Sequence, residues 1–189
     1  MNNEDRRRFL LTLPAVAAAI AATRPAAAQG SDPQNTVYLD TKDGRITIRL
    51  RPDLAPRHVA QIKTLVKQHF YDGIVFHRVI GGFMAQTGDP TGTGTGKSSL
   101  PNLKAEFSDT PFKRGTVGMA RSNDPDSANS QFFICFDDAS SLNGKYTVIG
   151  EVASGMDVVD KIKKGSTSAN GSVTNPDKIV KMRLASDAA

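Results

Sequence analysis

The sequence predicts a mainly β protein, with a closed eight-stranded antiparallel β-barrel capped by two α-helices. Three observations predict this class: short apolar runs alternate with a period of two, Gly-rich turns separate them, and only two stretches have helical spacing. At 189 residues the chain is long enough for one domain with a substantial core.

A β-hairpin is predicted at the start of the barrel. Apolar residues alternate with polar ones over 37–39 and again over 46–50. Lys42-Asp43-Gly44 lies between these runs and suits a turn with positive φ.

The first helix is predicted directly after this hairpin. The segment 52–56 holds two prolines and stops the strand, and Pro56 is acceptable in a first helical turn. Asp72-Gly73 is predicted to end the element. The apolar residues at helical spacing are Val59, Ile62, Leu65 and Val66, with Phe70 one turn further on.

The remaining predicted elements are short. A second helix is expected over 155–163, and the segment 165–175, rich in Ser, Thr, Gly and Asn, is expected to be a surface loop. A last strand contains Ile179, Met182 and Leu184. The other strand-like runs are 74–79, 84–86, 117–120, 132–136 and 147–152.

The charge pattern gives no sign of a nucleic-acid-binding protein. The formal net charge is +5, and residues 1–28, with four arginines against Glu4 and Asp5, contribute +2 of it. The remaining +3 is an ordinary solvated surface, with no Lys/Arg block that suggests nucleic acid. The single cysteine, Cys135, cannot form an internal disulfide and is expected to be a small buried hydrophobe.

Residues 1–28 have the pattern of an export signal peptide of the twin-arginine type. Arg6-Arg7, one further residue and then Phe9-Leu10 precede a mildly apolar, Ala-rich run. That run is too short for a comfortable membrane span. An ordinary general-secretion signal is one alternative, and an uncleaved segment that anchors the protein is another.

Cleavage is expected after three small residues, Ala26-Ala27-Ala28, which leaves Gln29 as the mature N-terminus. The mature form then has no membrane span. Residues 29–35 are predicted to be a polar linker to one domain at 36–187.

The segment 76–89 concentrates the chemically informative side chains. It places Arg78, Phe83, Met84 and Gln86 on what the pattern predicts to be two short strands around a Gly-Gly corner. It offers no nucleophile and no obvious general base, so hydrolysis is a poor match. A fixed guanidinium beside an apolar pocket suits a reaction that makes no covalent bond, such as rotation about an Xaa-Pro peptide bond.

Several segments, in order and spacing, resemble those of one protein family, the cyclophilins, which are peptidyl-prolyl isomerases that bind cyclosporin. The resemblance covers about residues 35–185 and implies an eight-stranded barrel capped by two helices, in agreement with the pattern. The short connection at 103–107 resembles the compact bacterial members. The segments are Phe76-His77-Arg78-Val79-Ile80, Phe83-Met84-Ala85-Gln86, Gly88-Asp89-Pro90-Thr91-Gly92-Thr93-Gly94, Gly115-Thr116-Val117-Gly118-Met119-Ala120-Arg121, Asn129-Ser130-Gln131-Phe132-Phe133-Ile134 and Leu142-Asn143-Gly144-Lys145-Tyr146-Thr147-Val148-Ile149-Gly150.

The resemblance implies two catalytic residues. Arg78 matches the family's arginine, whose guanidinium N–H groups are aimed at the proline nitrogen when the amide is twisted. Gln86 matches a position that hydrogen-bonds the carbonyl side of the rotating amide. For Arg78 the alternative is a surface arginine in a salt bridge.

The resemblance also implies a substrate-binding set. Four of its members, Phe83, Met84, Phe133 and Leu142, match the pocket that takes the proline ring, and ordinary barrel core is the alternative for each. The others are Ala120 and Arg121, which match a strand whose backbone pairs with the peptide, Gln131, which either holds substrate or braces its neighbours, and Tyr146.

Three positions depart from the family's pattern. Ser141 stands where animal members often carry Trp, so this pocket wall lacks an aromatic ring and weak cyclosporin binding is expected. Tyr146 stands where those members carry His, and its phenol can still donate a hydrogen bond. Arg121 stands where Asn is common, and we expect this change to alter substrate preference more than rate.

No metal or cofactor is expected. His58 and His69 lie eleven residues apart on the predicted helix, which is not the i, i+4 pairing of a zinc helix. His77 is expected to make a buried structural hydrogen bond. The Gly-rich segment 92–97 lacks the spacing of a phosphate-binding loop.

These features together predict an exported, soluble, cofactor-free peptidyl-prolyl cis-trans isomerase. Its partners are expected to be proline-containing polypeptides outside the cytoplasmic membrane, and it is expected to be a monomer. The alternative is a proline-peptide-binding holdase or scaffold with little turnover. A small-molecule carrier is less favoured, because large apolar residues on facing strands should fill the barrel.

Overall fold

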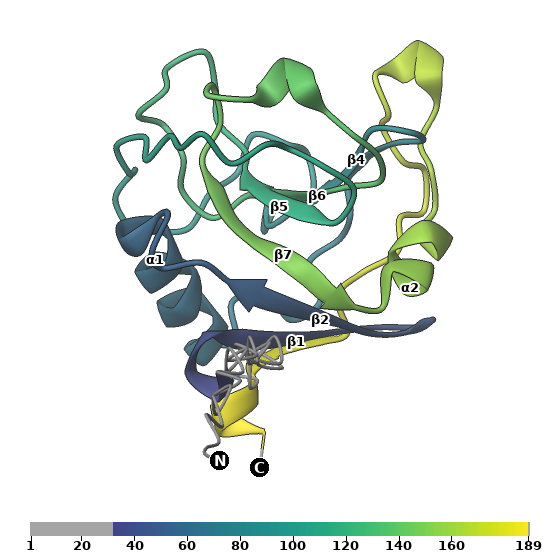
Figure 1. Ribbon diagram of the computed structural model, residues 1–189. Coiled ribbons are helices and arrows are strands. Elements are labelled where there is room, and N and C mark those ends of the chain that lie inside the picture. Colours follow the sequence, from purple (N-terminus) through teal and green to yellow (C-terminus); the bar gives the residue numbers. More distant parts are fainter. Residues whose placement is uncertain (1–31, 189) are drawn as a thin grey trace, which may run out of the picture. The chain divides into compact units, whose positions relative to one another are not determined.

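The structure, a computed structural model, describes residues 32–188 (Figure 1). These residues form two α-helices, α1 (Pro56–Lys67) and α2 (Met156–Lys161), and short 3-10 turns that include η2 (Ser140–Leu142) and η3 (Thr167–Ala169). The strands are β1 (Thr36–Thr41), β2 (Gly44–Leu50), β3 (Arg78–Ile80), β4 (Met84–Thr87), β5 (Thr116–Met119), β6 (Phe132–Cys135), β7 (Val148–Ser154) and β8 (Lys181–Leu184).

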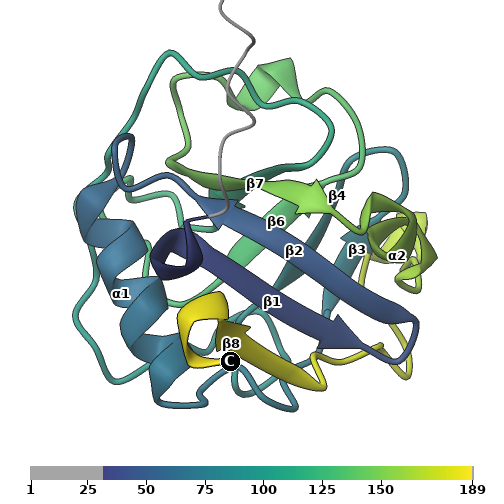
Figure 2. The same ribbon diagram turned by 60° about the horizontal axis from the view of Figure 1, so that its bottom comes forward.

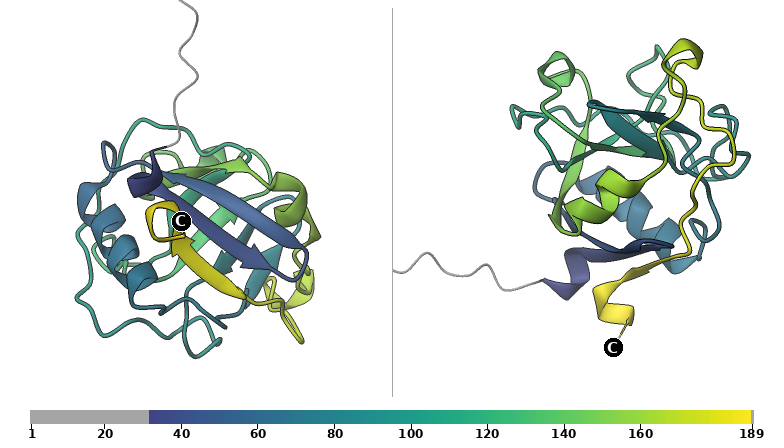
Figure 3. Two further views of the ribbon diagram at one scale, coloured as in Figure 1. Left: turned by 90° about the horizontal axis from the view of Figure 1, so that it is seen from below. Right: turned by 90° about the vertical axis from the view of Figure 1, so that its right-hand side faces the viewer.

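All eight strands belong to one strongly curled antiparallel sheet, in the order β3-β4-β6-β5-β7-β2-β1-β8. The predicted class, eight antiparallel strands with two helices, is confirmed. In Figures 1 and 2, α1 and α2 lie at opposite sides of the curled sheet. The turns η2 and η3 lie at the end of the molecule opposite β1 and β8 (Figure 3).

The strand ladder is not continuous between the edge strands β3 and β8. The segments just before them are joined instead, by backbone hydrogen bonds of 2.8 Å from Gly73 to Ile179, from Ile179 to Ile74 and from Phe76 to Asp177. Of the strand predicted over 74–79, only its last two residues therefore lie in β3. The preceding residues form the seam that brings the two edges of the sheet together.

The helix α1 begins at Pro56 as predicted, but it ends at Lys67, before Phe70. The reason is a left-handed residue, His69, with φ of 58°. The N–H of His69 donates to Val66 and that of Phe70 to Leu65, each at 3.0 Å, which is the pattern of a Schellman cap. The apolar residues of the helix face the main core, as the spacing predicted.

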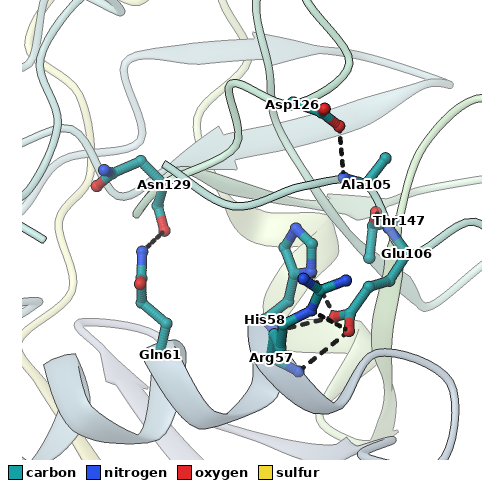
Figure 4. Close-up of polar contacts among 8 residues, drawn as sticks. All are labelled: Arg57, His58, Gln61, Ala105, Glu106, Asp126, Asn129 and Thr147. Atoms are coloured by element: carbon teal, nitrogen blue, oxygen red, sulfur yellow. Dashed lines mark hydrogen bonds and ion pairs between the residues drawn. The ribbon is translucent and has the colours of Figure 1, made fainter. Parts of the chain in front are cut away.

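The connection at 103–107 is anchored to α1 through Glu106 (Figure 4). The N-cap residue of α1 has no side-chain cap. The Glu106 carboxylate takes that role, because it accepts hydrogen bonds from the backbone N–H of His58 at 3.1 Å and of Arg57 at 3.3 Å. It also lies 2.6 Å from Nδ1 of the buried His58. On the other side, the Glu106 N–H donates to Thr147 Oγ1 at 3.0 Å.

A second hydrophobic cluster lies apart from the main core and supports the candidate site. Its buried members are Met84, Phe112, Phe133, Cys135, Ala139 and Val148. Burial raises the pKa of Cys135 to about 12, so the thiol stays neutral and packs as a hydrophobe, as predicted. Partly buried residues that pack against this cluster include Phe83, Leu142 and Tyr146.

Candidate active site

A cavity of ≈ 170 Å³ lies over β3, β4 and the ends of β5 and β6, beside η2. We call it the smaller cavity. It brings together every predicted site residue except Gln131. Its lining residues are Arg78, Phe83, Met84, Gln86, Ala120, Arg121, Phe133, Leu142 and Tyr146.

The register of three strands explains this assembly. Arg78 on β3 is paired with Gln86 on β4, and Gln86 is paired with Phe133 on β6, so the three residues form one row across the sheet. Met84 precedes Gln86 by two positions and therefore lies on the same face. Met84 is only 2% exposed and Phe133 only 4% exposed, so both residues belong to the core as well as to the cavity wall.

Aromatic contacts fix the part of the cavity wall that holds Phe133 and Tyr146. The Phe133 ring meets Tyr146 edge-on, with centroids 6.0 Å apart, and stacks on Phe112 at 5.8 Å. Tyr146 in turn lies under the guanidinium of Arg121, whose central carbon is 4.4 Å from the ring centroid. Arg121 thus contributes its side chain to this wall, beyond the backbone pairing predicted for it.

The guanidinium of Arg78 is partly buried and is held by neutral acceptors. Its Nη1 donates to Gln86 Oε1 at 3.3 Å, its Nε to the carbonyl oxygen of Asn170 at 3.1 Å, and its Nη2 to Asn170 Oδ1 at 3.0 Å. Within residues 32–188 no carboxylate lies at ion-pair distance from it. Burial lowers the pKa of Arg78, but a guanidinium remains protonated near neutral pH.

Gln131 lies beside the smaller cavity and braces its neighbours, one of the two roles considered for it. Its Oε1 accepts from Gln86 Nε2 at 2.8 Å, and its Nε2 donates to the carbonyls of Gly94 at 3.1 Å and Gly96 at 2.8 Å. Gln86 is thereby held between Gln131 and Arg78.

The Gly-rich loop behind Gln131 is organised by a buried carboxylate. Asp89 accepts hydrogen bonds from the N–H and hydroxyl of Thr91, both at 2.7 Å, and from the N–H groups of Gly94 at 2.6 Å and Gly96 at 3.1 Å. Burial raises the pKa of Asp89, but these donors outweigh it and hold the pKa at about 2. The loop is therefore a built support for the site.

Comparison with known proteins agrees with this geometry. The sequence profile of the family described as "Cyclophilin type peptidyl-prolyl cis-trans isomerase/CLD" matches residues 36–184. The chain belongs to the cyclophilin family.

Proteins similar to this cyclophilin occur in several bacteria. A probable peptidyl-prolyl cis-trans isomerase of Brucella suis is 57% identical over 96% of this chain and 97% of its own. A peptidyl-prolyl cis-trans isomerase of Helicobacter pylori is 44% identical over 67% of this chain and 79% of its own. The crystal structure of cyclophilin AquaCyp293 from Hirschia baltica superposes with a TM-score of 0.75 at 31% identity, covering 84% of this chain and 76% of that one.

A second, larger cavity of ≈ 440 Å³ adjoins the smaller one in this cyclophilin. The two share Gln86, Ala120 and Arg121. The larger cavity is lined by polar and cationic groups, which include Lys97, Asn102, Ser122, Ser127 and Gln131.

None of the three histidines lines either cavity, and the structural hydrogen bond predicted for His77 is not formed among the described residues. His77 is buried, but neither ring nitrogen has a hydrogen-bond partner within the described chain. Its ring packs against Gly94, where an added Cβ would lie 3.4 Å from His77 Cδ2. Over residues 32–188, no cluster of His, Cys, Asp or Glu is placed to hold a metal ion. The same residues contain no helix long and apolar enough to cross a membrane.

Sequence reasoning missed Asn170 and Gly118 as supporting residues. Asn170 falls in the segment 165–175 that the sequence predicts to be a surface loop, and the only local signal is that Asn followed by Gly favours left-handed backbone. Gly118 belongs to the family segment 115–121, but the two rings that approach it, from Phe112 and Phe133, come from other parts of the chain.

Proposed function

We propose that the smaller cavity is where this cyclophilin rotates Xaa-Pro bonds, with Arg78 and Gln86 as its catalytic residues. One observation carries the proposal: the guanidinium of Arg78 lines the same cavity as Phe83, Met84 and Phe133. A cation over an apolar slot can act on the nitrogen of a proline whose ring occupies that slot.

The physical basis is the electronic change during rotation. The barrier of about 20 kcal/mol exists because the amide nitrogen shares its lone pair with the carbonyl. In the twisted transition state the nitrogen becomes pyramidal and regains that lone pair. An N–H group of Arg78 then binds the twisted amide more strongly than either planar form, which lowers the barrier.

The other residues fix one side of the bond while the other side turns. In this proposal Phe83, Met84, Phe133 and Leu142 hold the pyrrolidine ring, and Gln86 hydrogen-bonds the carbonyl side. The residues beside them, Ala120 through its backbone and Arg121, Gln131 and Tyr146 through polar side chains, bind or orient the flanking peptide.

An isomerase assay on a short Xaa-Pro peptide tests this assignment. We expect Arg78→Ala to lower kcat/KM at least about 100-fold while the Kd of the peptide changes little, because the lost contact is made in the transition state. Arg51→Ala is the matched control, since Arg51 is an exposed arginine paired with Asp53 away from the cavity. Wild-type protein that binds the peptide without accelerating its isomerisation would instead be a holdase.

We further propose that the protein is exported by the twin-arginine route to the periplasm and assists the folding of exported proteins there. The support is the leader pattern of residues 1–28, which lies outside the described residues, together with the slowness of uncatalysed isomerisation, which can limit folding. Export should be blocked when Arg6-Arg7 is replaced by Lys-Lys. Unchanged export of that variant contradicts the route.

Weak cyclosporin binding belongs to the same proposal. Ser141 lies in η2, is exposed and does not line either cavity, so it supplies no aromatic wall. Inhibition by cyclosporin at nanomolar concentration would contradict this expectation.

A further inference from the structure

The guanidinium of Arg78 is oriented by a loop that follows α2 and is remote in sequence. Asn170 lies 92 residues after Arg78 and accepts two of its hydrogen bonds, one through the backbone carbonyl and one through Oδ1. Gln86 accepts a third. A guanidinium has five N–H donors, so these three bonds fix its plane and leave two donors for a substrate amide.

The backbone conformation of Asn170 makes this double contact available. Its φ is 51°, in the left-handed region that Asn tolerates better than most residues. Gly171 follows with φ of 79°. The two consecutive left-handed residues turn the chain so that one residue presents both of its oxygens to the same side chain.

The loop that carries Asn170 is attached to the strand that carries Arg78. Val79 donates its N–H to the carbonyl of Gly171 at 2.8 Å and accepts from the N–H of Gly165 at 2.9 Å. The packing is close, because a Cβ on Gly171 would lie 2.4 Å from Ile80 Cγ1. Asn170 is therefore held in a defined place relative to β3.

We propose that Asn170 is a positioning residue for Arg78, an inference that rests on the catalytic role proposed for that arginine. Its two oxygens hold the guanidinium over the smaller cavity without the carboxylate that would compete with a substrate for the positive charge. A displaced guanidinium would still bind the peptide region but would meet the twisted amide less well.

The variant Asn170→Gly tests this with little disturbance of the backbone. Glycine adopts the same positive φ and keeps the carbonyl that accepts from Nε, so only the Oδ1 contact is removed. Asn175→Gly is the matched control. Asn175 has φ of 50° in the same loop, and its carbonyl accepts a hydrogen bond from Lys163 Nζ, which a glycine retains.

We expect Asn170→Gly to lower kcat/KM for a short Xaa-Pro peptide about tenfold, with the Kd of the peptide and the Tm unchanged. Asn175→Gly should leave all three unchanged. In an Arg78→Ala background, Asn170→Gly should cause no further loss, because it acts through the arginine. An equal loss in both backgrounds, or no loss in the wild-type background, would overturn the inference.

A spectroscopic measurement on the unmodified protein makes the test independent of how the variant folds. The Nε–H of Arg78, donated to Asn170, should give a resolved side-chain NMR signal that exchanges slowly with water. A rapidly exchanging signal overturns the inference and leaves the catalytic role of Arg78 to be judged from Arg78→Ala alone. If both Arg78→Ala and Asn170→Gly retain the activity of the wild type, the proposed function itself is refuted.

Discussion

Gly118 lies in β5 opposite Phe133, at a point where two aromatic rings approach the backbone. A Cβ there would lie 2.6 Å from Phe133 Cζ and 2.6 Å from Phe112 Cε1, which is closer than carbon atoms can pack. We expect Gly118→Ala to push the Phe133 ring into the smaller cavity. The variant should lose about 1–3 kcal/mol of stability and weaken peptide binding several-fold, measured by thermal unfolding and by Kd.

Gly81→Ala is the control for this residue. Gly81 is also near the site, but a Cβ there would meet only Lys164 Cγ, at 3.5 Å, which is an ordinary contact. Its Kd should remain that of the wild type. Equal peptide binding by Gly118→Ala and the wild type would contradict the role assigned to the Phe133 wall.

At the scale of elements, the start of α1 depends on a pair of ionisable groups, the buried His58 and the largely buried Glu106. Burial raises the pKa of Glu106, but hydrogen bonds from His58 and Arg57 outweigh it, so the folded pKa lies below the ordinary 4.5. Burial lowers the pKa of His58 below its ordinary 6.5, and the attraction of Glu106 offsets this only in part. In both cases the unfolded chain binds protons more readily than the folded chain.

Both groups therefore make the folded state less stable as the pH is lowered. The contribution of His58 is present above pH 6.5 and declines as the pH falls below it, and that of Glu106 is present above pH 4.5 and declines below that. We expect the free energy of unfolding, measured by denaturant titration, to fall below pH 6.5 and to fall further below pH 4.5. Burial also lowers the pKa of His77, which acts in the same direction.

The variant Glu106→Gln isolates the contribution of the Glu106 carboxylate to stability. Glu106→Gln should cost about 2 kcal/mol at pH 7, because a buried helix cap loses charge-assisted hydrogen bonds. It should also lose less stability than the wild type between pH 4.5 and pH 3. Glu151→Gln is the control, since Glu151 is an exposed partner of Arg49 and its change should be within about 0.5 kcal/mol.

At the scale of the whole molecule, the features that depend on local sequence patterns were predicted, and the contacts between distant segments were not. Period-two runs and helical spacing located the hairpin strands and both helices, because these elements bury mainly one face. The central strands β5 and β6 are buried at every position, so they show no such alternation. Patterns could not show that 73–76 pairs with 177–179, nor that Asn170 reaches Arg78, because both contacts join segments about a hundred residues apart. The motif at 76–89 predicted Arg78, Phe83, Met84 and Gln86, and the resemblance of the later segments implied the remaining site residues. The hydrogen bonds by which Asp89 supports the site became visible only in the folded chain.

The two adjoining cavities together predict which peptides the molecule prefers. Lys97 and Arg121 line the larger cavity, no acidic residue lines it, and among residues 32–188 neither side chain is paired with a carboxylate. A peptide that extends from the smaller cavity into the larger one should therefore gain from an acidic residue near its proline. We expect kcat/KM to be about two- to fivefold higher for peptides with Glu than for those with Lys at a flanking position, at low salt.

This preference should be electrostatic, because it depends on the charges of Lys97 and Arg121. The ratio of kcat/KM for Glu peptides to that for Lys peptides should therefore fall toward one as the salt concentration rises. Lys97→Gln should reduce the Glu-to-Lys ratio and leave kcat/KM for a Gln-containing peptide unchanged, because Lys97 lies outside the smaller cavity. Lys104→Gln, which changes a lysine that lines neither cavity, should leave the ratio as it is. A ratio that is insensitive to salt and to Lys97 would show that the larger cavity does not select the flanking residue by charge.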